Sequence, residues 1–256
     1  MNQMILRRIA QHMKQQHWTG VFIELVIVVV GVFIGLQVNK WNEQRQDRAL
    51  EKQYLQRLHD DIQLSIETAN YNIRDMRMQY RLDDDMLAAL HSCRLEGAEK
   101  NRFIAGAYAL GKIDPPPLVR GTIDELRSTG RIGLIRDVDL RTQLAKLVEG
   151  ANTFGEIFHV IVARTNPAIA YVDKRIELKI TPETHGTANV LKNGMPDGDY
   201  RFDFPALCKD PQFAAVISNV QALTLDVVVM NQKRLASFKK LSQTIDSNLS
   251  SMKEDR

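Results

Sequence analysis

An apolar run over residues 21–38 constrains this chain more than any other feature of its sequence. The chain has two tryptophans, Trp18 and Trp41, and they bracket the run. A helix rises about 1.5 Å per residue, so these two residues would lie roughly 34 Å apart, close to the thickness of a bilayer. Because Trp is favoured at both membrane–water interfaces, we predict a transmembrane helix over 19–41 with Trp18 and Trp41 as interface anchors.

A cleaved signal peptide is the competing interpretation of the run. Its uninterrupted apolar core, Leu25–Leu36, is about twelve residues long, which is within the range of a signal sequence. The residues that follow, 37–40, offer no small-residue cleavage site. We therefore expect an anchor that stays attached to the protein.

The charges on either side of the run bear on its orientation. Segment 1–18 contains Arg7, Arg8 and Lys14 and no acidic residue, whereas the other flank mixes basic and acidic residues. A strict count of Lys and Arg slightly favours the second flank as the cytoplasmic one, but a short, purely basic leader is typical of a signal-anchor. We expect 1–18 to be a basic cytoplasmic tail and 42–256 to be an extracytoplasmic domain.

Polar and small residues of the run fall on one side of the predicted helix. At about 100° per residue, Glu24, Gly31 and Gly35 lie within about 40° of one another. The Gly31-x-x-x-Gly35 spacing lets two helices approach closely, and an ionisable residue in a membrane usually faces a partner. Alternatively, Glu24 reaches the nearby interface, as long polar side chains near helix ends do. The predicted helix–helix interface, named the anchor face here, comprises Glu24, Val28, Gly31, Gly35, Asn39 and Asn42.

Two segments carry a family resemblance. The first runs from Glu24 through both glycines to Trp41-Asn42-Glu43, and the second runs from Thr122 to Asp137. The first resembles the E-(apolar)-G-(apolar)-Q-x-N-x-W-N-E opening of a family of uncharacterised bacterial single-pass membrane proteins, in which it leads into a long polar helix. The resemblance implies a domain of unknown function in a bacterial inner membrane, and it implies no activity.

Composition limits what the rest of the chain can be. Residues 42–256 are enough for one sizeable domain or two small ones. The net charge is +3, and no basic stripe interleaved with aromatic residues is present, so we expect no nucleic-acid partner. Cys93 and Cys208 would be able to pair outside the cytoplasm, whereas in a reducing compartment they would be buried thiols.

The fold class predicted for the domain is mainly α, an elongated bundle of long antiparallel helices. Residues 42–92 contain no Pro or Gly and carry apolar residues at heptad-like spacing. A break is expected near 83–85, where we interpret three successive aspartates as a solvated helix start and not as a cation site. The heptad-like positions are Leu55, Leu58, Ile62, Ala69 and Met76.

Residues 93–136 predict short helices around a Pro-rich turn. A helix over 102–110 would end at Gly111, before the extended bend of prolines 115–117. Thr122-x-x-Glu125 matches a capping box, and Gly130 occupies a C-cap position, which together predict a helix over 123–129.

The remaining chain predicts two longer helices and an insertion. Asp137 would cap a helix over 137–166, which Pro167 would stop. The Pro- and Gly-rich segment 176–205 predicts a loop or a small hairpin. A helix over 211–252 would pack antiparallel to 42–92 and return the C-terminus toward the membrane. The apolar face predicted for 137–166 comprises Leu140, Leu144, Leu147, Ala151, Phe154, Phe158 and Ile161.

No established catalytic motif is present, and the six histidines are scattered. Neighbouring residues on a helix diverge, so His59-Asp60-Asp61 and His91-x-Cys93 make poor metal sites. We expect no enzyme, no cofactor and no metal, with Cys93 acting with a distant histidine as the catalytic alternative.

Two non-enzymatic functions stay open. The first is a membrane-anchored interaction, assembly or accessory module whose partners are the bilayer and either a second copy or another membrane protein. The second is a sensor-like helical domain that binds a small ligand between helices and signals through a partner.

Overall fold

The computed structural model describes residues 18–115 and 118–254, the side chains of 18–21 and 254 excepted. The chain forms two compact units, Met1–Gln53 and Tyr54–Arg256. Helices account for most of the described residues, so the fold is mainly α, as predicted. The predicted tail over 1–18 lies outside the described residues except for the backbone of Trp18.

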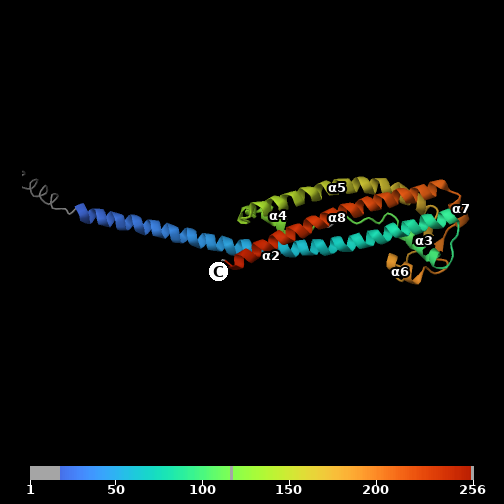
Figure 1. Cartoon of the computed structure of the whole chain (residues 1–256), viewed down its shortest axis with the longest axis horizontal. Coiled ribbons are helices and arrows are strands. Elements are labelled where there is room, and N and C mark those ends of the chain that lie inside the picture. Colours follow the sequence, from blue (N-terminus) through green and yellow to red (C-terminus); the bar gives the residue numbers. More distant parts are fainter. Residues whose placement is uncertain (1–17, 116–117, 255–256) are drawn as a thin grey trace, which may run out of the picture. The chain divides into compact units, whose positions relative to one another are not determined.

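Helix α2 (Trp18–Ser92) supplies all of the described part of the first unit (Figure 1). Every apolar side chain of residues 22–38 is exposed there, and none of its most apolar window is buried. A helix that is apolar all round is normally buried, either in a protein core or in a membrane. The predicted long apolar helix near the N-terminus is therefore present.

Helix α8 (Pro211–Glu254) is the second helix in the described part of the chain that is long and apolar enough to cross a membrane. Its most apolar window differs from that of α2 because 33% of it is buried. Phe213, Ile217 and Val220 of α8 belong to a core cluster of the second unit. The buried face of α8 is accordingly satisfied by packing within that unit.

The second unit is built on three long helices, namely α2 from Tyr54 onward, α5 (Val138–Asp173) and α8 (Figure 1). Side-chain pairs between α2 and α8 run in opposite directions along the two helices. Gln63 Nε2 donates to Ser242 Oγ at 2.8 Å, and Gln221 Nε2 donates to Asp84 Oδ1 at 2.6 Å. The two helices are therefore antiparallel.

Helices α5 and α8 are antiparallel as well. Asn248 Nδ2 donates to Asp137 Oδ2 at 2.7 Å, and Thr244 Oγ1 donates to Gln143 Oε1 at 3.3 Å. The apolar positions predicted for 42–92 are buried, as are most of those predicted for 137–166, where Ala151 and Phe158 are half-buried. Helix α8 also buries one face. These core residues include Leu55, Leu58, Ile62, Ala69 and Met76 of α2, Leu140, Leu144, Leu147, Phe154 and Ile161 of α5, and Phe213, Val220, Val227, Phe238, Leu241 and Ile245 of α8.

Short elements gather where α2 ends and α8 begins (Figure 1). The Cys93–Cys208 disulfide joins the end of α2 to this region, with the two Cα atoms 5.6 Å apart. The predicted loop or hairpin over 176–205 contains a two-stranded antiparallel ladder with a short helix between its strands. The elements are α3 (Gly97–Ala109), β1 (Glu177–Leu178), α6 (Thr187–Asn193), β2 (Tyr200–Arg201) and α7 (Phe204–Cys208).

The predicted stop at Pro167 is wrong, because α5 continues through it to Asp173. Proline at this position leaves the carbonyl of Ala163 without its helical donor. Both residues lie on the exposed face of α5, where water can solvate that carbonyl. Ile161 and Val172 are buried on either side of the proline, so core packing holds the helix together.

The predicted break near 83–85 is also wrong, and so is the solvated helix start assigned to the three aspartates. Helix α2 runs through them without interruption, and Asp83 is fully buried between Leu82 and Met86, which are buried too. The carboxylate of Asp83 accepts a hydrogen bond from Gln79 Nε2 at 2.7 Å. Desolvation raises the pKa of Asp83 to about 7.

Candidate functional site

The anchor face lies on the exposed part of α2. A Cβ atom added to Gly31 or Gly35 would meet nothing within 4 Å, and Val28 is 63% exposed. Glu24 and Asn42 are exposed, and Asn39 Nδ2 donates to Glu43 Oε1 at 3.0 Å. The two glycines therefore leave a smooth strip of backbone on which another helix can pack closely.

The structure describes the side chain of one of the two predicted interface anchors, Trp41, but not that of Trp18. Trp41 lies on α2 and is 66% exposed. Trp18 begins α2, but its side chain lies outside the described ones. The exposed indole of Trp41 suits a membrane interface, which is apolar on one side and wet on the other.

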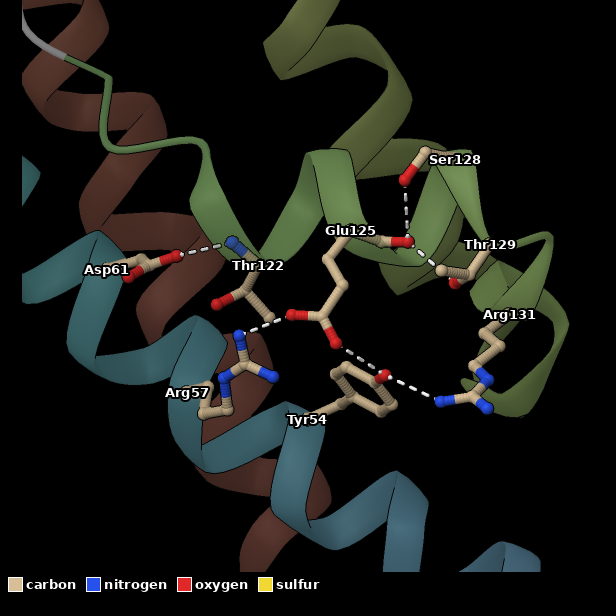
Figure 2. A network of polar contacts seen from close by, with 8 residues as sticks. All are labelled: Tyr54, Arg57, Asp61, Thr122, Glu125, Ser128, Thr129 and Arg131. Carbon is tan, nitrogen blue, oxygen red and sulfur yellow. Dashed lines mark hydrogen bonds and ion pairs between the residues drawn. The ribbon is translucent and has the colours of Figure 1, made fainter.

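A network of polar contacts, named the junction network here, ties α4 (Gly121–Ser128) to α2 where the chain enters the second unit (Figure 2). Glu125 of α4 is its centre. Tyr54 Oη donates to Glu125 Oε1 at 2.8 Å, and Arg57 Nη2 donates to Glu125 Oε2 at 2.5 Å. Arg131 Nη1 donates in turn to the Tyr54 hydroxyl at 3.3 Å. The hydrogen bonds from Arg57 and Tyr54 lower the pKa of Glu125.

The predicted capping box of α4 is wrong. The residue before the helix is Arg120, which provides no side-chain cap, and Asp61 of α2 accepts a hydrogen bond from the backbone N–H of Thr122 at 3.0 Å (Figure 2). Glu125 does not reach back to its own helix terminus, because Tyr54 and Arg57 bind its carboxylate. A contact between distant segments thus replaces the local cap.

Two other local signals in this region are confirmed. Gly130 follows α4 in a left-handed conformation with φ 68°, and the 3-10 helix η1 (Arg131–Leu134) begins after it. Asp137 caps α5 by accepting hydrogen bonds from Asp139 N at 2.8 Å and Leu140 N at 3.0 Å. Asn248 of α8 and these amides lower the pKa of Asp137.

The segment from Thr122 to Asp137 therefore connects all three long helices. Through Glu125 it contacts α2, and through Asp137 it contacts α5 and α8. Sequence reasoning missed Tyr54, Arg57 and Arg131 as parts of this network. The only available signal was the second resemblance segment, which contains Glu125 and Arg131 but does not reveal their partners on α2.

The histidine and cysteine candidates for chemistry are separated. Cys93 forms a disulfide with Cys208, so in this structure it is not the free thiol that a nucleophilic cysteine requires. His59 lies within 3.4 Å of Asp60 and 3.3 Å of Asp246. Within residues 18–115 and 118–254, no three His, Cys, Asp or Glu side chains are grouped so that they would hold a metal ion.

Comparison of the chain with protein-family models, with curated proteins and with solved structures finds no match. The anchor face and the junction network are thus interpreted from their own geometry.

Proposed function

We propose that this chain is a single-pass membrane protein that acts as a non-enzymatic interaction module, and that its anchor face binds another transmembrane helix. That helix belongs to a second copy or to a partner membrane protein. The proposal includes residence in a bacterial inner membrane and membership of the family that the Glu24–Glu43 segment resembles. Residues 42–256 would form its extracytoplasmic domain.

The observation that carries the proposal is the exposure of the apolar helix over 22–38 together with the open strip at Gly31 and Gly35. Exposing so long an apolar helix to water is unfavourable, whereas the hydrocarbon core of a bilayer solvates it. Lipid alone does not explain an ionisable residue and two glycines on one stripe. A second helix packed on that stripe would provide a polar environment for Glu24 and close contact at the glycines.

The disulfide supports the proposed orientation. Disulfides form and persist in oxidising compartments and are rare in the cytosol. Cys93 and Cys208 are 115 residues apart in sequence, and both belong to the second unit. A domain that folds with this bond belongs outside the cytoplasm, which agrees with a cytoplasmic N-terminus.

A bacterial two-hybrid assay with cytoplasmic N-terminal fusions tests the anchor face. The variant Gly31→Leu/Gly35→Leu should abolish the association of full-length chains or of the chain with its partner. Val26→Leu/Val30→Leu alters the opposite side of the helix at the same spacing and should leave the association unchanged. Association that survives the glycine substitutions contradicts the proposal.

The second candidate function is the sensor-like domain that binds a small ligand between helices. A groove between α5 and α8 favours it, because small-molecule sites commonly lie between the helices of bundles. Such a domain would signal through a partner bound at the anchor face.

A further inference from the structure

A groove of about 620 Å³ lies between α5 and α8. Its apolar lining includes Leu147, Phe154 and Leu241, which are buried, and Ile157, which is 41% exposed. The volume falls within the roughly 300–1,000 Å³ that is usual for small-molecule sites. The groove is therefore large enough for a ligand with a substantial apolar part.

The rim of the groove is strongly basic. Lys146, Lys233, Arg234 and Lys240 line it together with a single carboxylate, that of Glu149. In the described part of the chain, none of these four cations is within ion-pair distance of a carboxylate. The groove thus combines an apolar floor with an excess of unpaired positive charge.

Arg234 is the most unusual of these cations. It is half-buried, and its guanidinium carbon lies 5.6 Å from the centre of the Phe154 ring. Desolvation lowers the pKa of Arg234. A partly desolvated guanidinium beside an aromatic ring is well suited to bind an anion that enters the groove.

The two ends of the groove differ in chemistry. Gln143 pairs with Thr244, and moving about one turn inward along each antiparallel helix reaches Lys146 and Lys240, which therefore lie at the same level. Further along in the same direction, beyond Phe154, the lining ends at Ile157 and Met230. One end therefore carries Lys146 and Lys240, whereas the last lining residues at the other end, Ile157 and Met230, are apolar, with Lys233 about one turn from Met230.

The length of the groove suits one acyl chain. The lining residues of α5 extend from Gln143 to Ile157, which is about 21 Å of helix. One acyl chain spans half of a hydrocarbon core that is roughly 30 Å thick, so it fits this length.

We propose that the α5–α8 groove binds a single-chain anionic lipid. Its acidic head lies between Lys146 and Lys240 and faces Arg234, whose Nη2 atom lies beside Gly150, one turn from Lys146. Its chain runs along Phe154, and its end reaches Ile157 and Met230. This proposal names a ligand class for the sensor-like function and does not rest on the anchor face, which lies in the other unit.

Photolabelling of the full-length chain in phosphatidylcholine nanodiscs tests the proposal. The probe is hexadecanoic acid with a diazirine near the end of its chain, and its methyl ester serves as the uncharged probe. Peptide mapping compares labels in α5 and α8 with labels in residues 22–38, which report how much probe enters the bilayer. The acid should label Phe154, Ile157 or Met230, and relative groove labelling by the ester should be about fivefold weaker.

Two variants make the test specific. Lys146→Gln/Lys240→Gln should reduce groove labelling by the acid about fivefold, whereas Lys239→Gln/Lys253→Gln, which removes two exposed α8 cations outside the groove, should not change it. Gly150→Leu fills the groove, because a Cβ there would meet only Arg234 Nη2 at 3.6 Å. It should abolish groove labelling while helix content, measured by circular dichroism, is retained.

Two results would overturn the assignment. In the first, the acid and the ester label the groove equally, and the Lys146 and Lys240 substitutions do not change that labelling. In the second, the groove is not labelled, and a carbodiimide cross-links its lysines to a protein carboxylate. That result would identify an acidic polypeptide as the occupant. Neither result depends on whether Gly31 and Gly35 mediate association, so this test and that of the anchor face fail separately.

Discussion

The substitution Asp83→Asn should stabilise the second unit at neutral and basic pH. Asp83 is fully buried on α2, and among the described residues its Oδ2 atom has no hydrogen-bond partner. Asparagine has nearly the same shape, keeps an oxygen that accepts from Gln79, and carries no charge. The substitution therefore removes a buried ionisation and preserves the packing around it.

The magnitude follows from the raised pKa. Burial raises the pKa of Asp83 from 3.8 to about 7, so the folded protein keeps this proton where the unfolded chain has lost it. The free energy of unfolding should then fall by about 3 kcal/mol as the pH rises from 4 to 7, and become level by about pH 8. Asp83→Asn removes this loss, so its stabilisation should be about 2–3 kcal/mol larger at pH 8 than at pH 5.

Urea unfolding of the full chain in mild detergent, followed by far-ultraviolet circular dichroism, measures this difference. Tryptophan fluorescence would not, because Trp18 and Trp41 both lie in the first unit. Asp226→Asn is the matched control, since it removes an exposed carboxylate of α8. A gain from Asp83→Asn that is the same at both pH values, or a loss at pH 8, would refute the assignment of a buried carboxyl with a raised pKa.

Four further variants test the packing of the second unit by the same unfolding assay. Asp137→Ala removes the cap of α5 and should cost about 1 kcal/mol, with less effect in acid because the lowered pKa of Asp137 makes its contribution fade as the carboxylate is protonated. Replacing both Cys93 and Cys208 by serine should cost about 2–5 kcal/mol, and in intact cells the wild-type thiols should resist alkylation until a reductant is added. Gly106→Ala should cost about 1–3 kcal/mol, since its Cβ would lie 2.6 Å from a buried methionine sulfur, whereas Gly155→Ala faces open space on α5 and should gain about 0.5–1 kcal/mol.

Features that depend on local patterns were predictable from the sequence. Leu55, Leu58 and Ile62 are buried because heptad-like spacing puts them on one side of a helix, whatever packs against it. Gly130 and Asp137 were predictable for a similar reason, because helix termini impose their own conformational and hydrogen-bonding needs.

Features that depend on contacts between distant segments were not predictable from the sequence. Glu125 fits a capping box by spacing, yet its partners are Tyr54 and Arg57, about seventy residues away. Pro167 is a stop signal only when the packing on either side is weak, and here the buried face of α5 continues past it. The run of three aspartates predicts a solvated Asp83, because the sequence does not reveal the packing that buries this residue.

The candidate sites divide in the same way. The placement of Glu24, Gly31 and Gly35 on one side of a helix needs only a helical wheel, and the structure leaves that side open at Gly31 and Gly35. Its role as an interface stays a prediction. The basic groove was not predictable, because only the antiparallel pairing of α5 and α8 places Lys146 and Lys240 side by side along the groove.

Site-specific photo-crosslinking in living cells tests the central claim, that the anchor face binds another helix, most directly. A photoreactive amino acid such as benzoylphenylalanine would replace one residue at a time over 24–38. The account predicts protein adducts at Glu24, Val28, Gly31 and Gly35 and none on the opposite side of the helix, at positions 26, 30 and 33. Adducts of equal yield around the whole helix, or no protein adduct at any position, would contradict it.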